Sequence, residues 1–168
     1  MRAYVASTYL ELGRFRDAAE QVIRRLGYEP EMLDVLDGLS DEEVVAELRR
    51  RVLRCDCIVV VVGFGRGSTP SVTGLEDSSF TAVEYETASH HDLPVLVFHI
   101  AGQAKPMRSD LPHDTLEAIR TENVWVERFK NGQLKTHMIK RVEDVEEFEV
   151  ALSTALVHFQ AASGDRAG

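Results

Sequence analysis

Two runs of consecutive apolar residues stand out in the middle of the chain, CIVVVVG at 57–63 and LPVLVFHI at 93–100. Both are rich in β-branched side chains and lack the alternation of a half-exposed strand, so they predict strands covered on both faces. A loop rich in Gly, Ser and Thr and a helix over 80–90 lie between them. This order of strand, loop, helix and strand is typical of an α/β protein with a parallel sheet.

Apolar residues spaced three and four apart predict three further helices, over 10–26, 40–54 and 144–161. The stretch RAYVA at 2–6 predicts a short first strand that lies at or next to the centre of the sheet. A weaker strand, near the sheet's outer edge, is expected over 28–36.

Local signals mark the ends of these helices. Ser40 and Glu43 have the spacing of a capping box, and Asp144 with Glu147 repeats it before the last helix. Gly27 follows the first helix, where a C-cap glycine is expected.

The region between the fourth strand and the last helix is less regular. A polar loop is expected to lead to a short helix over 114–121. The stretch 122–142 then predicts two strands around Asn131 and Gly132, a favoured hairpin turn pair. One of these strands is expected to complete the sheet, and the other to form an extra edge strand of a hairpin.

These elements predict an α/β, flavodoxin-like fold. Its five-stranded parallel sheet is expected to have the order 2-1-3-4-5, with helices on both faces. We expect a single domain over 1–162 and a disordered tail at 163–168.

Composition restricts the partners and the compartment. The chain has 168 residues and a net charge of −9, which argues against a nucleic-acid backbone or an anionic membrane as partner. Neither a membrane-length apolar run nor a signal peptide is apparent, so a cytoplasmic location is expected. Cys55 and Cys57 are too close in sequence for an unstrained disulfide, and two ligands do not make a zinc site. We therefore expect two reduced, buried thiols and no metal.

Ligands of open parallel sheets bind outside the carboxyl ends of the strands, which directs attention to the segment 63–84. The glycines at 63, 65 and 67 follow a strand, but no helix starts at the third glycine and no lysine follows it. The segment is therefore neither a dinucleotide fingerprint nor a P-loop. The glycines either let a ligand approach the backbone closely or form a flexible loop, and the sequence leaves both open.

Glu84 is the leading candidate for chemistry. It shares a helix face with Phe80 and Ala88, so it is either partly buried near the strand ends or exposed at the helix start. Burial would raise its pKa and suit it to nucleophilic or acid–base work. Glu86 lies on another face and is expected to be solvated. His99, in a buried strand, is expected to be a hydrogen-bonded core residue.

Three segments carry a family resemblance: YVASTYLELGRFRDAAEQVIRRLGYEP, CDCIVVVVGFGRGS and SFTAVEYETASHHDLPVLVF. They resemble the hallmarks of a TIR-like family, domain of unknown function 4062, often found at the N-terminus of STAND-type NTPase signalling proteins. The resemblance covers 2–100. Ala6 and Glu11 depart from it, where the family has serine and aspartate.

This family is grouped with TIR domains and with nucleoside deoxyribosyltransferases, which share the flavodoxin-like fold. The stretch FTAVEYETA at 80–88 is similar to the transferase motif that holds the nucleophilic glutamate. The resemblance implies that Glu84 is the nucleophile and that Tyr4 supports it. It also implies a pocket for phosphate or ribose, lined by Ser7, Thr8, Gly63, Gly65, Arg66, Gly67, Ser68 and Thr81.

Two classes of function remain open at this point. One is an enzyme that cleaves the N-glycosidic bond of NAD or a nucleotide, without a cofactor. The other is a non-catalytic module that signals, self-associates, docks onto a protein effector or senses a nucleotide.

Overall fold

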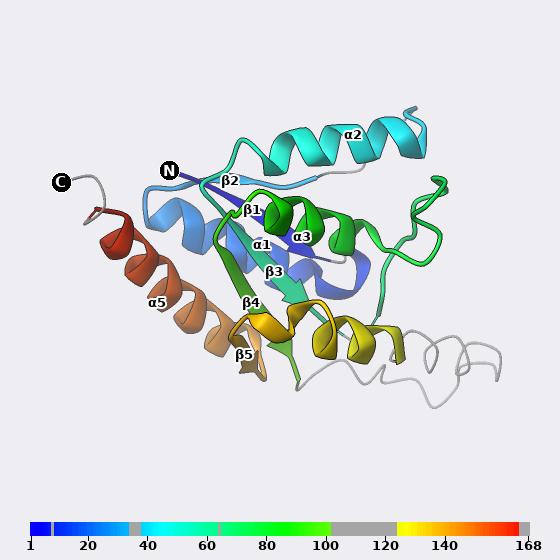
Figure 1. The fold of residues 1–168 in the computed structure, drawn as a ribbon. Coiled ribbons are helices and arrows are strands. Elements are labelled where there is room, and N and C mark those ends of the chain that lie inside the picture. Colours follow the sequence, from blue (N-terminus) through cyan, green and yellow to red (C-terminus); the bar gives the residue numbers. More distant parts are fainter. Residues whose placement is uncertain (8, 34–37, 64, 102–123, 165–168) are drawn as a thin grey trace.

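The computed structural model describes residues 1–7, 9–33, 38–63, 65–101 and 124–164. Five parallel strands form one sheet in the order β2-β1-β3-β4-β5, which confirms the flavodoxin-like prediction (Figure 1). β3 is central and β1 lies next to it, as expected for the first strand. The strands are β1 (Arg2–Ser7), β2 (Glu29–Glu31), β3 (Cys57–Val62), β4 (Val95–Ile100) and β5 (Ile139–Val142).

Helices cover both faces of the sheet. α1 and α5 pack on one face, while α3 and part of α2 pack on the other, and Figure 1 shows α3 in front of the sheet with α1 behind it. These helices are α1 (Tyr9–Arg25), α2 (Asp41–Val52), α3 (Phe80–His90) and α5 (Val145–Gly164). α3 and β4 have the predicted bounds.

The alternation of side chains along β1 divides the core into two layers. Ala3 and Val5 belong to the cluster under α1 and α5, whereas Tyr4 and Ala6 belong to the cluster under α3. All four residues are buried, so β1 contributes to both layers at once.

The helix boundaries follow the local signals. Ser40 accepts a hydrogen bond from the Glu43 backbone N–H, and the Glu43 side chain accepts one from the Ser40 N–H, which confirms the capping box. Ser79 caps α3 by accepting from the Ala82 N–H at 3.1 Å. Gly27 has a φ of 78°, a conformation that glycine adopts without strain.

The predicted hairpin over 122–142 is wrong in its first half. Residues 124–131 are helical, and the Gly132 N–H donates to the Arg128 carbonyl at 2.8 Å, closing the helix where a hairpin turn was expected. Val126 and Phe129, three apart, are both buried, and the Phe129 ring meets Tyr85 of α3 edge-on at 5.7 Å. Tertiary packing thus overrides the strand preference of this Val- and Trp-containing run. The second half forms β5, the fifth strand as expected.

Some predictions fall on other boundaries or on residues outside the described ranges. The outer strand β2 is shorter than predicted, and α5 extends to Gly164, past the expected domain end at 162. The predicted helix over 114–121 and the residues 165–168 lie outside the described residues. Within the part of the chain that the structure describes, no helix combines the length and apolar character needed to cross a bilayer.

Candidate functional site

A buried hydrogen bond joins Tyr4 of β1 to Glu84 of α3. The Tyr4 hydroxyl donates to Glu84 Oε1 at 2.6 Å, although the two residues are 80 positions apart in sequence. Tyr4 is completely buried and Glu84 is only 5% exposed. The expected pairing of these two side chains is therefore confirmed as geometry.

The surroundings of Glu84 disfavour its charged form. Burial raises the pKa of its carboxyl group to about 8, while the hydrogen bond from Tyr4 and the positive charge of Arg16 act in the opposite direction. The pKa of Tyr4 is raised as well, first by burial and then by the charge of Glu84. At neutral pH the Glu84 carboxyl group is therefore mostly protonated and uncharged, and it ionises in mildly alkaline solution.

The fold explains why Glu84 points inward. α3 follows the loop after β3 and lies over the sheet, so residues on its inner side meet β1 and β3. Ala82, Tyr85 and Ala88 are buried beside Tyr4 in the same cluster. Glu86 lies on the outer side, half-buried, where its carboxylate accepts a hydrogen bond from Gln133 Nε2 at 2.7 Å. The two carboxylates thus lie on different faces of α3, as predicted, but Glu86 is half-buried and hydrogen-bonded where full solvation was expected.

The loop between β3 and α3 is tied to three other parts of the molecule. The Ser71 N–H donates to Asp41 Oδ2 at the start of α2, at 2.6 Å. Trp125 Nε1 donates to the Asp77 carbonyl at 3.0 Å. The Phe80 N–H, at the start of α3, donates to the Ser68 carbonyl at 3.1 Å. These contacts hold the loop between α2, α3 and the helical segment 124–131.

The predicted pocket residues occupy different places along this loop and at the start of α3. Gly63 follows β3 and packs closely on α1, because a Cβ atom there would come within 2.9 Å of the Leu12 side chain. Arg66 donates to the Thr69 hydroxyl within the loop. The remaining candidates here are Gly65 and Thr81, half-buried, Gly67 with a φ of 77°, and Ser68, exposed.

Ser7 does not share the environment of Glu84. By strand alternation its side chain faces the α1 and α5 layer, whereas Tyr4 faces α3. The Ser7 Oγ is buried and has no hydrogen-bond partner among the described residues. Thr8 lies outside the described residues. The structure therefore brings together Tyr4 and Glu84 but places Ser7 on the opposite face of the sheet.

Arg16 is a neighbour of the pair that its sequence pattern did not indicate. The spacing of the apolar residues in α1 predicts that Arg16 lies on the polar face of the helix, yet it is only 5% exposed. Its guanidinium donates to the Leu33 carbonyl just after β2. Its charge lowers the pKa of both Tyr4 and Glu84. Its only sequence signal is its place in the first of the three segments that carry the family resemblance.

The two cysteines are buried and form no disulfide, as expected. Cys55 and Cys57 are free and buried, and burial raises the pKa of each thiol to about 12. Within the described ranges, no group of three or more His, Cys, Asp or Glu side chains is placed to hold a metal ion.

Comparison with known proteins gives one family. The sequence matches the family model described as "Domain of unknown function (DUF4062)" over residues 2–157, a range that includes all five strands. No curated protein matches the sequence. Among solved structures, the chain is similar to a diflavin flavoprotein A3 from Nostoc sp., with 16% identity and a TM-score of 0.45, over 99% of this chain and 94% of that chain.

Proposed function

This chain belongs to the family described as domain of unknown function 4062, and we propose that it cleaves the N-glycosidic bond of NAD or another nucleotide. The observation that carries the proposal is the buried 2.6 Å hydrogen bond from Tyr4 to Glu84. A carboxyl group held this way inside an α/β core has a fixed orientation and a raised pKa, two properties common in reacting carboxylates.

In the proposed reaction, Glu84 acts on the anomeric carbon of the ribose. The Tyr4 hydroxyl engages Oε1, which leaves Oε2 to attack C1′. The bond from Oε2 to C1′ forms as the bond from C1′ to the base nitrogen breaks, and the base leaves with the bonding electrons. Water then attacks C1′ of the ribosyl ester, releases the Glu84 carboxylate and gives up its proton to solvent.

This role requires ionised Glu84 and therefore predicts a characteristic pH dependence. With a pKa of about 8, roughly one tenth of the molecules carry a charged Glu84 at pH 7. Because the nucleophile is the charged form, kcat/KM is expected to rise with pH and to level off above about 8. A rate that falls over the same range would assign Glu84 the role of acid instead.

The decisive experiment is incubation with NAD and with a set of nucleotides and nucleosides, with products identified by mass spectrometry. Glu84→Gln is expected to lower turnover by roughly a thousandfold or more, since the amide can neither attack nor ionise. The amide has nearly the shape of the protonated acid, so the fold is expected to persist. Glu86→Gln is the matched control and should change little. Absence of turnover by the wild-type protein, even when concentrated, would overturn the proposal.

The burial of the pair favours a second candidate, a non-catalytic module. Tyr4 has no exposed surface, and the pair is satisfied in the way of an internal structural contact. In this alternative the domain acts in the cytoplasm within a TIR-like or STAND-type signalling protein, where it self-associates, docks onto an effector or senses a nucleotide. Nucleotide binding without product formation would identify a sensor.

A further inference from the structure

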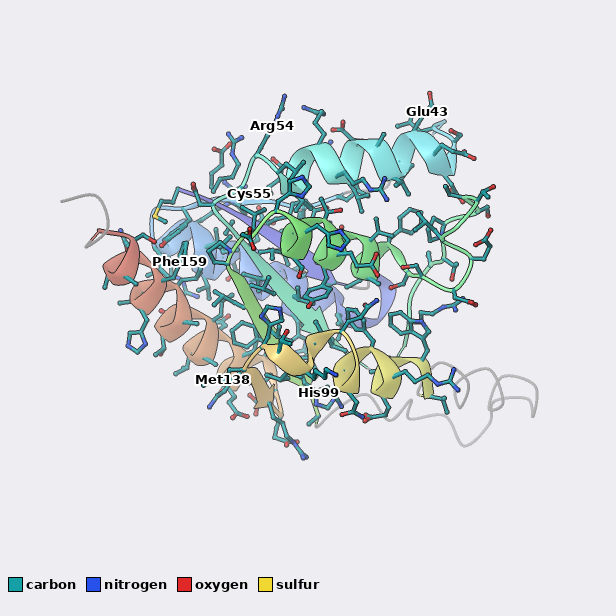
Figure 2. All side chains as sticks on the ribbon, viewed as in Figure 1. Glu43, Arg54, Cys55, His99, Met138 and Phe159 are labelled. Atoms are coloured by element: carbon teal, nitrogen blue, oxygen red, sulfur yellow. The ribbon has the colours of Figure 1, made fainter. Side chains whose placement is uncertain are left out.

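We infer that Lys130 and His99 form a phosphate-binding subsite at the carboxyl end of β4. The inference rests on the proposed function, because the phosphate is taken to be part of the nucleotide on which Glu84 acts. It narrows the substrate class to phosphate-bearing nucleotides and excludes free nucleosides as good substrates. Figure 2 shows His99 beside the helical segment 124–131, which carries Lys130.

The ammonium group of Lys130 contacts the imidazole ring of His99 directly. Lys130 Nζ lies 3.3 Å from His99 Nε2 and donates to Glu127 Oε1 at 2.8 Å. An ammonium group can only donate, so His99 must accept through Nε2 and carry its proton on Nδ1. Lys130 has three N–H donors, and two are used by these contacts. Among the described residues, the third N–H of Lys130 and the N–H at His99 Nδ1 have no partner, so each can donate to an anion.

The site is sheltered but reachable. The Lys130 side chain is 14% exposed and His99 is half-buried, whereas the Glu127 side chain is 59% exposed. A sheltered ammonium attracts an anion more strongly than one in bulk water, because solvent screens it less. Glu127, on the outside, can turn into solvent when a phosphate takes its place beside Lys130.

The charge state of His99 is sensitive to what binds there. Burial and the charge of Lys130 lower the pKa of His99; Arg141 acts in the same direction, while Glu127 and Glu143 oppose it. A phosphate beside Lys130 would add negative charge and favour the imidazolium form. Phosphate binding is therefore expected to raise the pKa of His99 and to take up a proton.

The subsite lies on the same side of the sheet as Glu84. Val97 of β4 shares the core cluster of Tyr4, and His99, two residues further along, points to the same face. In the strand register, Tyr4 lies opposite Ile58, and Val62 lies opposite His99. Relative to Tyr4, His99 is thus two strands across and four residues further toward the carboxyl ends of the strands. This offset separates the Cα atoms of Tyr4 and His99 by roughly 16 Å. A ligand that spans this region carries its anionic group several bonds from the reacting carbon, as a nucleotide does.

The competing explanation is that Lys130 only fastens the helical segment 124–131 to β4. The test is an NMR titration of the His99 ring in Glu84→Gln protein, which does not consume ligand, with inorganic phosphate, a nucleoside 5′-monophosphate and the same nucleoside in separate arms. The nucleotide is expected to raise the pKa of His99 and to bind more tightly than phosphate, while the nucleoside leaves His99 unchanged. A pKa of His99 that no phosphate-bearing probe moves would overturn the inference.

Variants of Lys130 distinguish a role in binding phosphate from a role in holding the helical segment 124–131 on β4. Lys130→Met is expected to weaken nucleotide binding roughly tenfold or more, Lys130→Arg to preserve most of it, and Lys135→Met, on an exposed turn, to change nothing. Equal affinity in Lys130→Met and wild type would refute the subsite even if nucleotides are cleaved. Should Lys130→Met fail to fold, the His99 titration in Glu84→Gln protein, with Lys130 intact, decides alone. Conversely, tight phosphate-dependent binding without any cleavage would refute the proposed function and leave the subsite standing.

Discussion

The two faces of the sheet are built from different chemistry. Under α1 and α5, aromatic rings meet edge-on: Phe148 contacts Phe15 at 5.6 Å and Phe98 at 5.2 Å between ring centroids. Under α3, by contrast, the core holds a hydrogen-bonded carboxyl group. Four polar or charged residues are buried in the described part of the chain, and three of them, Ser79, Glu84 and Thr87, belong to α3 or its N-cap.

These three polar residues differ in what they do for the helix. Ser79 caps α3, and the Thr87 hydroxyl donates to the Val83 carbonyl one turn earlier at 2.7 Å. Both contacts lie within α3 and its N-cap, and they give each buried hydroxyl group a hydrogen-bond partner close in sequence. Glu84 instead reaches a strand residue and loses its solvation, a cost that an apolar residue of similar size would avoid. A group that the fold would be more stable without is a candidate for function, and this separates the α3 face from the α1 and α5 face.

The largest loss of stability is expected from a substitution in the layer under α1 and α5. Phe148→Ala removes both edge-to-face ring contacts and leaves a cavity, so the free energy of unfolding should fall by about 3–5 kcal/mol. Urea denaturation measures this change. Phe159→Ala, near the end of α5 and only partly buried, is the matched control and should cost less. Equal losses in the two variants would show that the aromatic cluster is not the centre of this layer.

The α3 face should instead respond to pH. The pKa of Glu84 is about 8 in the folded protein and near 4.5 in an unfolded chain, so the folded state retains a proton that the unfolded state loses. The stability that Glu84 contributes is full below pH 4.5 and is lost as pH rises toward 8. The free energy of unfolding should therefore fall by up to about 1.4 kcal/mol per pH unit across this window.

Substitution tests the origin of this slope. Glu84→Gln has no titrating proton and should flatten the pH dependence of unfolding between pH 5 and 8. Glu86→Gln, altered at a half-buried carboxylate two residues away, should keep it. A slope that survives in Glu84→Gln would mean that another group titrates, and that Glu84 is charged in the folded protein.

The sequence pattern predicted the fold wherever one signal dominated. The buried strands at β3 and β4 were continuous apolar runs, and the alternation of strands with amphipathic helices gave the parallel order. The segment 124–131 failed because its signals conflicted: valines, a tryptophan and an Asn-Gly pair favour a hairpin, while the three-residue spacing of Val126 and Phe129 favours a helix. Contacts with residues far away in sequence, such as Phe129 with Tyr85 and Trp125 with Asp77, accompany the helical form, and the local pattern does not contain them.

The candidate site was also predictable only where a clear signal stood in the sequence. Tyr4 and Glu84 were found through resemblance in two separate segments, and alternation along β1 then places Ser7 on the other face. Arg16 escaped prediction because a helix residue beside a buried position can turn inward once it has a carbonyl partner, here that of Leu33. The contact between Lys130 and His99 depends on the helical state of a segment that the pattern assigned to a strand.

The smallest expected effects come from two tyrosines that carry hydroxyl groups into the α3 layer. Tyr4→Phe keeps the ring but removes the donor to Glu84, leaving a buried carboxyl group without that partner, so unfolding should become easier by about 1–3 kcal/mol. Tyr85→Phe removes a hydroxyl that donates to the Gln133 carbonyl at 2.8 Å, near exposed residues where water can replace it, and should cost about 0.5–1.5 kcal/mol. Thermal and urea unfolding measure both.

Tyr4→Phe and Tyr85→Phe are expected to differ more in how their free energy of unfolding depends on pH than in how much of it they lose. The hydrogen bond from Tyr4 lowers the pKa of Glu84, so Tyr4→Phe should raise that pKa above about 8 and extend the falling part of the stability curve to higher pH. Tyr85→Phe leaves the carboxyl environment intact and should not move the curve. Identical pH profiles in the two variants would show that Tyr4 only fills space, and the α3 face would then differ from the α1 and α5 face in composition but not in the chemistry it can support.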